Sequence, residues 1–179
     1  MVCNRCISAV ENIFENLNIK VSSVILGEVE TEKELTVNEI ATVNQSLQDQ
    51  GFQILEDRVK IQIEKIKNLI ILEINSLDLP EDFILSKFIS AQLGKDYSLL
   101  SKNFSLLENV TLEQYFILQK IEKVKELLLY NEFSLTEISQ KLGYKSVQHL
   151  SAQFRNSTGC TPTTFKTLKL NDRTSLDLI

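Results

Sequence analysis

A pattern of apolar and turn residues that occurs twice between residues 89 and 165 constrains this chain more than any other feature. The two copies are offset by 49 residues up to the glycine of a turn and by 50 after it, because the second turn has one extra residue. The corresponding pairs are Ile89 and Ile138, Leu93 and Leu142, Gly94 and Gly143, Leu100 and Leu150, Phe104 and Phe154, Thr111 and Thr161, and Tyr115 and Phe165. Apolar residues at these spacings predict short amphipathic helices in each copy. We therefore expect two helix-turn-helix units in tandem.

The second copy carries start and end signals for its helices. Ser134 followed by Glu137 is a capping box, in which each side chain bonds to a backbone N–H at the helix start. Gly143 suits the left-handed conformation that ends a helix. Thr161 and Pro162 favour the start of a further helix as N-cap and first helical residue. Taken alone, this segment is equally compatible with a piece of a helical bundle, and the repeat is what favours a helix-turn-helix.

The helix after Gly143 places polar side chains opposite its apolar ones. The apolar positions are Val147, Leu150 and Phe154, and the residues expected to point outwards are Gln148, His149, Ala152, Gln153 and Arg155. Glutamine pairs with adenine, and arginine pairs with guanine or phosphate. Lys145 and Ser146 lie at the helix N-terminus, where backbone N–H groups favour a phosphate. The pattern predicts a surface that contacts DNA.

A stretch without glycine or proline, from Leu112 to Glu132, connects the two copies. Thr111 is its expected N-cap, and its apolar residues recur at helical spacing. We expect one continuous helix. At about 1.5 Å per residue, 18 residues span about 27 Å, which is comparable with the roughly 34 Å between successive turns of DNA. A spacer of this length allows a single chain to reach adjacent major grooves.

Residues from about 63 to 169 resemble the DNA-binding domain of the AraC/XylS family of bacterial transcription regulators. The resemblance rests on the segments ELLLYNEFSLTEISQKLGY, HLSAQF and TGCTPTTF. It implies two helix-turn-helix subdomains joined by a long helix, each with one helix facing the major groove. The positions it implies for DNA contact are Ser98, Ser101 and Lys102 in the first copy and Ser146, Val147, Gln148, His149 and Ser151 in the second. Ala152 stands where the family often has arginine, so the usual base contact is not expected there.

The resemblance also implies partners and roles. Double-stranded DNA is the expected partner, a contact with RNA polymerase is a further one, and either a monomer or a homodimer is compatible. We expect Gln148 and His149 to carry specificity, and Lys102, Lys145 and Arg155 to add affinity. A DNA contact is the favoured role for His149 and a metal ligand the alternative, because no cysteine or carboxylate cluster accompanies it.

The acidity of the chain belongs to its front segment. Residues 1–57 carry three basic and ten acidic residues, a net charge of −7, so the remainder carries +2 of the total of −5. A mildly basic module predicts modest non-specific DNA binding. The acidic stretch GEVETEKE is expected to be a solvated loop, with shielding of the DNA-binding face as the alternative.

The front segment opens with the CxxC motif of Cys3 and Cys6, at the start of an apolar helical stripe. Strand material in KVSSVILGEVE, a helix capped by Thr36 and Glu39, and a last strand in FQILED are then expected. This order resembles the heavy-metal-associated domain, a ferredoxin-like βαββαβ module with an MxCxxC metal loop. That module has a strand before the motif, so either the true start lies upstream of Met1 or the first strand is missing.

Three interpretations of Cys3 and Cys6 remain open: binding of Cu(I) or another thiophilic ion, inert reduced thiols, and a redox switch. No cofactor is required by the sequence. Cys160 corresponds to Val110 in the first copy and is expected to be a packing residue. With one histidine and no Ser-His-acid set, we expect no enzyme, and a thiol oxidoreductase using the cysteine pair is the strongest enzymatic alternative. A metal-binding or thiol-redox module whose helical part serves assembly is the alternative to a DNA-binding regulator.

The expected architecture is α+β at the front and all-α behind. Residues 1–57 form the ferredoxin-like segment, residues 58–169 the DNA-binding domain, and residues 170–179 a polar tail. A helix from Asp57 to about Ile74, with apolar positions Val59, Ile63, Ile66, Ile70 and Ile74, joins the first two directly. No run of 18 apolar residues predicts a membrane span, and the start lacks the features of a signal peptide. We therefore expect a cytoplasmic protein with no membrane partner.

Overall fold

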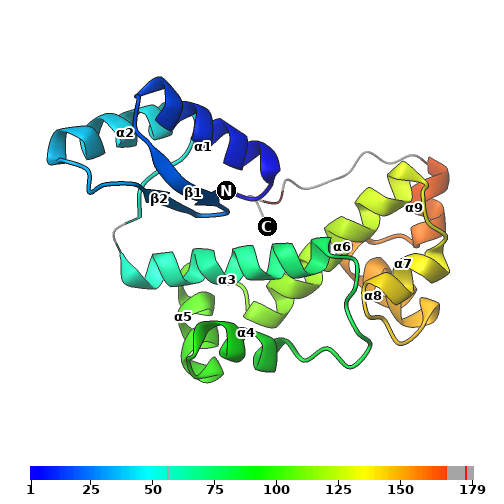
Figure 1. Ribbon diagram of the computed structural model, residues 1–179. Coiled ribbons are helices and arrows are strands. Elements are labelled where there is room, and N and C mark those ends of the chain that lie inside the picture. The colour runs from blue at the N-terminus through cyan, green and yellow to red at the C-terminus, as the bar shows by residue number, and fades with distance from the viewer. Residues whose placement is uncertain (56, 169–175, 177–179) are drawn as a thin grey trace. The chain divides into compact units, whose positions relative to one another are not determined.

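The computed structural model describes residues 1–55, 57–168 and 176 (Figure 1). The chain divides into two compact units, Met1–Asn68 and Leu69–Ile179. Helix α3 (Arg58–Asn75) begins in the first unit and ends in the second. None of the helices in the described ranges is both long and apolar enough to cross a membrane. The polar tail expected at residues 170–179 falls outside the described residues except for Leu176.

The first unit consists of two helices and a β-hairpin in addition to the start of α3. Its elements in chain order are α1 (Asn4–Asn16), β1 (Val21–Ile25), β2 (Glu28–Thr31) and α2 (Val37–Asp49). The strands pair antiparallel with Val24 opposite Val29, and Gly27 makes the turn at a φ of 81°. The Thr36 and Glu39 capping box forms as expected. The buried core comprises Val10, Ile13, Phe14, Ile19, Val43 and Leu47.

The expected last strand in FQILED does not form at residues 52–55, and Glu56 lies outside the described residues. The Phe52 N–H donates to the Leu47 carbonyl at 2.8 Å, and the Ile54 N–H donates to Asn44 Oδ1 at 3.4 Å. These backbone donors are therefore bonded to α2 and not to a strand ladder. The described part of this unit has two strands, whereas a ferredoxin-like module has four, so the ferredoxin-like expectation is not confirmed.

Helix α3 confirms most of the expected apolar stripe. Ile63, Ile66, Ile70 and Ile74 are each at most 3% exposed. Val59 lies on the helix as expected, but it is 38% exposed and does not belong to the core. Val59 occupies the first turn of α3, where its backbone N–H donates a hydrogen bond to the capping Asp57 Oδ1 at 2.7 Å. The helix start is thus fixed by capping and not by burial of this side chain.

The turn of the hairpin is bonded to α3 within the first unit. Asn68 Nδ2 donates to the Leu26 carbonyl at 3.0 Å, and Lys65 Nζ lies 2.8 Å from Glu28 Oε2. A Cβ at Gly27 would collide with the Asn68 amide nitrogen, so only glycine allows this approach. Asn68 is 5% exposed, and its Oδ1 has no hydrogen-bond partner among the described residues. This hydrogen bond and this ion pair connect the hairpin to α3 within the first unit.

The second unit is built around a long, deeply buried helix. Its elements after α3 are α4 (Leu85–Leu93), α5 (Tyr97–Glu108), α6 (Leu112–Tyr130), α7 (Leu135–Lys141), α8 (Val147–Thr158) and α9 (Pro162–Leu168). Helix α6 packs against α5, α7, α8 and α9 (Figure 1). The expected spacer helix is confirmed and has 19 residues.

The repeat deduced from the sequence appears in the packing. Phe104 and Tyr115 pair edge to face with ring centroids 5.3 Å apart, and Phe154 and Phe165 pair in the same manner at 5.5 Å. These contacts link α5 to α6 and α8 to α9, the equivalent helices of the two copies. Edge-to-face aromatic pairs contribute about 0.5–1.5 kcal/mol beyond their burial. The one-residue adjustment in the alignment is therefore confirmed at the level of individual side chains.

Gly94 and Gly143, the glycines of the two turns, have the same backbone conformation but different surroundings. Gly94 and Gly143 have φ values of 62° and 63°. A Cβ on Gly94 would meet nothing within 4 Å, whereas a Cβ on Gly143 would lie 2.6 Å from the Pro80 carbonyl oxygen. The segment before α4 approaches because the Leu79 N–H donates to the Lys141 carbonyl at 3.1 Å. Gly143 is thus needed both for its backbone conformation and for its small size.

We expect substitution by alanine to lower the free energy of unfolding much more at Gly143 than at Gly94. At Gly94 the cost is the left-handed conformation alone, about 1–2 kcal/mol of unfolding free energy. At Gly143 the carbonyls of residues 79 and 80 must also move, which breaks the bond from Leu79 and brings the expected total to about 3 kcal/mol or more. Urea denaturation of Gly94→Ala and Gly143→Ala compares the two. Equal losses would contradict the close approach.

Candidate nucleic-acid interface

Helix α8 is fixed at both ends and on one face. Leu150 and Phe154 are buried against the unit. The Ser146 hydroxyl accepts a hydrogen bond from the His149 N–H at 3.1 Å, and the αL residue Gly159 ends the helix. Lys145, Ser146, Gln148, His149 and Arg155 are exposed, and Val147 and Ser151 are half-buried. All seven residues expected for DNA contact in the second copy therefore lie on α8 or immediately before it.

Helix α5 is capped and buried in the same way as α8, but its exposed side chains differ. Asp96 Oδ1 accepts from the Leu99 N–H at 3.1 Å, as Ser146 does for His149. Leu100 and Phe104 are buried, Ser98 and Lys102 are exposed, and Ser101 is half-buried. The three residues expected for DNA contact in the first copy thus share this helix. We call α5 and α8 the reading helices.

Tyr144, which the sequence analysis did not single out, connects α8 to the rest of the unit. It follows Gly143 where the second turn has its extra residue, and it is 4% exposed. Its hydroxyl donates to Gln153 Oε1 at 2.7 Å, and its ring meets the His149 ring edge to face at 5.5 Å. Gln153 was expected to point outwards, but it is half-buried and held by this bond. The extra residue in the alignment was the signal for Tyr144.

Lys120 on α6 lies under the same tyrosine. It is 8% exposed, and its Nζ lies 3.7 Å from the centroid of the Tyr144 ring and 5.5 Å from that of Phe116. Over the described ranges no carboxylate lies within ion-pair distance of it. Burial lowers the pKa of Lys120 to about 8. The two aromatic faces oppose this effect, because they stabilise the ammonium form. Lys120, Tyr144 and Gln153 thus form a continuous contact from α6 to α8.

The stability of the protein should respond to the titration of Lys120. Between pH 8 and 10.5 the folded chain has lost a proton that the unfolded chain keeps, so the free energy of unfolding rises with pH in this window. Lys120→Met removes this titration. From pH 7 to pH 9.5 we expect the free energy of unfolding of the wild type to rise by about 1–2 kcal/mol relative to that of Lys120→Met. Urea denaturation at each pH measures this difference. A constant difference across this range would show that the ammonium is not destabilised by burial.

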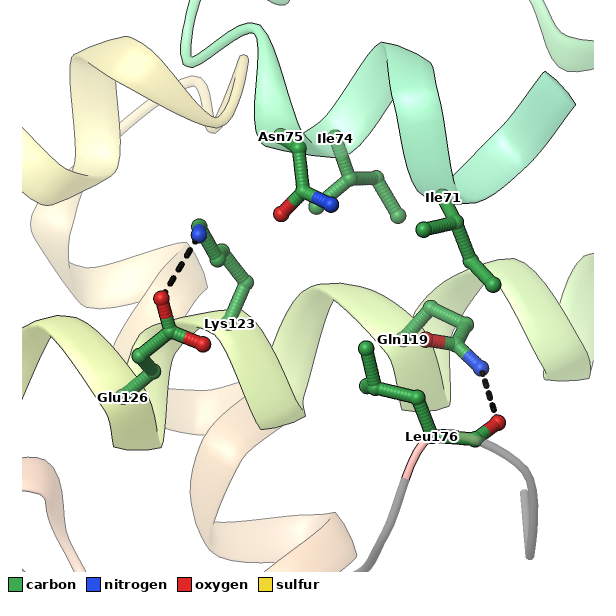
Figure 2. Close-up of a pocket in the computed structure, with 7 residues that line it drawn as sticks. All are labelled: Ile71, Ile74, Asn75, Gln119, Lys123, Glu126 and Leu176. Atoms are coloured by element: carbon green, nitrogen blue, oxygen red, sulfur yellow. Dashed lines mark hydrogen bonds and ion pairs between the residues drawn. The ribbon is translucent and has the colours of Figure 1, made fainter. Parts of the chain in front are cut away.

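A narrow cleft lies between α3 and α6 in the second unit (Figure 2). Figure 2 shows Ile71, Ile74 and Asn75 on one side, facing α6 on the other. On the α6 side Lys123 Nζ is paired with Glu126 Oε1 at 2.8 Å, and the Gln119 side chain bonds to the Leu176 carbonyl. The cleft has room for about one water molecule, which is too small for an organic effector.

The cysteine pair lies in the first unit, at the start of α1. Cys3 is the exposed N-cap residue, and its Sγ lies 3.7 Å from Cys6 Sγ. Burial raises the pKa of Cys6, but hydrogen bonds from the backbone at Val2 and Cys3 more than offset this and leave the pKa below its usual value. Among the described residues no third histidine, cysteine or carboxylate joins the pair to make a metal cluster. Cys160 lies in the second unit and is half-buried beside Thr158.

Comparisons with known proteins agree with the fold of the second unit. The chain resembles the C-terminal domain of AraT, a response regulator from Geobacillus stearothermophilus, with a TM-score of 0.54 and 18% identity over 66% of this chain and 95% of that one. It also resembles a DNA-binding transcriptional dual regulator from Escherichia coli K-12, with a TM-score of 0.49 and 24% identity over 57% and 90% of the two chains. The C-terminal domain of the response regulator yesN from Fusobacterium nucleatum gives a TM-score of 0.49 and 26% identity over 57% and 98%.

The family model that matches this chain is that of a helix-turn-helix domain, over residues 89–167. No protein with a curated function matches the chain by sequence. The matched residues run from α4 to α9 and include both reading helices, whereas the cysteine pair and the hairpin lie outside them. The heavy-metal-associated resemblance of the front segment is thus not supported. Residues 89–167 thus match a helix-turn-helix domain, and the fold of the second unit resembles that of the C-terminal domain of AraT.

Proposed function

We propose that this chain is a sequence-specific DNA-binding transcription regulator that places α5 and α8 in adjacent major grooves. The observation that carries the proposal is the duplication of a capped helix with an exposed polar face on the two sides of one buried helix. At about 1.5 Å per residue the 19 residues of α6 span about 28 Å, close to one turn of DNA. A single buried helix of this length gives the two reading helices a common support.

The exposed residues divide into two roles. Gln148 and His149 have the side chains that form hydrogen bonds with base edges, and Lys102, Lys145 and Arg155 are cations suited to phosphate. The charge of +2 on residues 58–179 predicts moderate affinity for random DNA. One chain carries both reading helices, so a monomer suffices, and a homodimer or a contact with RNA polymerase would extend this arrangement. Such a regulator acts in the bacterial cytoplasm.

Gln148→Ala tests the assignment of base recognition. An operator obtained by selection from random duplexes serves as the cognate DNA, and fluorescence anisotropy measures the dissociation constant. We expect the variant to lose about 1–3 kcal/mol on the operator and almost nothing on random DNA, because the lost contact is to a base edge. Equal losses on both duplexes would assign Gln148 to the DNA backbone instead.

Arg155→Ala is the matched control on the same helix. Its side chain is exposed on α8 like that of Gln148, but its expected partner is a phosphate. The variant should bind every duplex more weakly and should reduce the slope of log affinity against log salt by about one unit. If the slope stays the same, Arg155 does not neutralise a phosphate.

A second function, binding of a thiophilic ion by Cys3 and Cys6, is favoured by the separation of their sulfurs. Thiolates bound to one tetrahedral ion at about 2.3 Å are about 3.8 Å apart. The observed 3.7 Å fits this requirement without movement. The lowered pKa of Cys6 favours the thiolate that an ion needs. Thiolates are soft ligands, which suit Cu(I) or another thiophilic ion. A bound ion would hold the two thiolates together at the start of α1.

We propose further that this ion adjusts DNA binding through α3. The hairpin that packs beside α1 in the first unit is bonded to α3 at Asn68 and Lys65. The same helix continues to Asn75 as part of the second unit. A change of α1 against the hairpin can therefore act on a helix that the DNA-binding unit shares. The thiol-redox alternative uses the same sulfurs, and a change in DNA affinity on oxidation in the absence of metal would favour it.

Substitution of the cysteines tests ion binding and its proposed effect on DNA affinity separately. Competition with a chromophoric Cu(I) chelator should show one ion bound by the wild type and by Cys160→Ser, and none by the Cys3→Ser, Cys6→Ser double variant. Anisotropy on the selected operator should then change with Cu(I) in the first two proteins only. Ion binding without any change in DNA affinity would keep the metal site and exclude the coupling. Ion binding by the double variant would exclude the site.

A further inference from the structure

The two reading helices differ most at one equivalent position in their first turn. Leu99 on α5 and His149 on α8 are both the third residue after the N-cap, and each donates its N–H to the cap at 3.1 Å. His149 is exposed and polar, whereas Leu99 is an exposed leucine. Leu99 is 53% exposed, whereas the next residue, Leu100, is only 1% exposed. An apolar side chain therefore occupies a position where α8 presents a hydrogen-bonding ring.

The first turn of α5 is held so that this side chain stays outwards. Asp96 caps the turn, and the Tyr97 hydroxyl donates to Glu113 Oε1 on α6 at 2.6 Å. Burial, together with this bond, raises the pKa of Tyr97. Burial of Leu100 fixes the rotation of the helix about its axis. Leu99 is thus exposed in the first turn of α5.

The neighbours of Leu99 on the exposed face are polar. Ser98 precedes it, and Lys102 lies one helical turn further on, both exposed. Serine and lysine suit base edges and phosphates, and neither provides an apolar partner for leucine. The major groove offers one apolar group, the C5-methyl of thymine. We infer that Leu99 determines specificity by packing against a thymine methyl group in the half-site of α5, an inference that rests on the proposed function.

This assignment makes the two half-sites chemically different. The α5 half-site is selected by a methyl contact from Leu99, with Lys102 as the adjacent cation, whereas α8 has Ala152 at the position equivalent to Lys102. The half-site of α8 is selected by hydrogen bonds from Gln148 and His149. The operator is therefore not a direct repeat of one sequence, although the protein domain is a duplication.

Replacement of thymine by deoxyuridine tests the inference, because it removes only the methyl group. An operator is selected from random duplexes, each thymine is replaced in turn, and anisotropy gives the dissociation constants. We expect one replacement to weaken wild-type binding by about fourfold, the factor for one buried methyl group. The Leu99→Ala variant should bind the original operator with the same weakened affinity that the wild type shows for the operator carrying deoxyuridine at the sensitive position. The variant should bind these two duplexes equally.

Leu106→Ala is the matched control. Leu106 is 69% exposed on the same helix but lies two turns further from its N-terminus, so its loss should preserve the distinction between thymine and deoxyuridine. Circular dichroism checks that both variants are folded. Three outcomes would overturn the inference. Wild-type binding could be the same for every replaced duplex, the selected operator could contain no thymine, or Leu99→Ala could still distinguish thymine from deoxyuridine. Failure of the wild type to bind any duplex even at low salt would instead overturn the proposed function.

Discussion

The burial of α6 on nearly all sides is the constraint on which the second unit depends. Even polar residues of this helix are buried, among them Gln119, Lys120, Glu122 and Lys125. Glu122 and Lys125 form an ion pair at 2.6 Å with side chains less than a tenth exposed. This pair lies one turn apart on α6, so the helix itself compensates these two buried charges. Both reading helices contact α6, and their positions are set by the same scaffold.

The sequence predicts those parts of the fold that are specified locally. The capping boxes at Thr36 and Ser134, the left-handed glycines and the length of α6 each depend on residues a few positions apart. The repeat adds a second kind of information, because two copies of a weak pattern support one another. It located α5, whose own start signal at Asp96 differs from Ser146 in the second copy. The exposed candidates Gln148, His149 and Arg155 followed from the helical pattern, whereas Ser98, Ser101 and Lys102 were implied by the family resemblance.

The remaining features depend on contacts between distant residues. The segment FQILED has the composition of a strand, yet its backbone bonds to α2, which no periodicity reveals. Gln153 has the spacing of an outward residue, but a tyrosine from the preceding turn captures its amide. Lys120 looks like a solvated lysine on a helix and is covered by two rings. In each case tertiary packing overrides a pattern that is correct for an isolated helix or strand.

Helix α3 is part of the first unit up to Asn68 and of the second unit from Leu69. Unfolding of one half would remove the helical hydrogen bonds that cross this boundary and would leave the other half with a new helix end. The isoleucines of the stripe on α3 are buried on both sides of this boundary. The two cores therefore share one helix, and unfolding of either unit would leave its half of α3 without burial. Truncation within α3 would leave neither unit with its full complement of buried apolar surface.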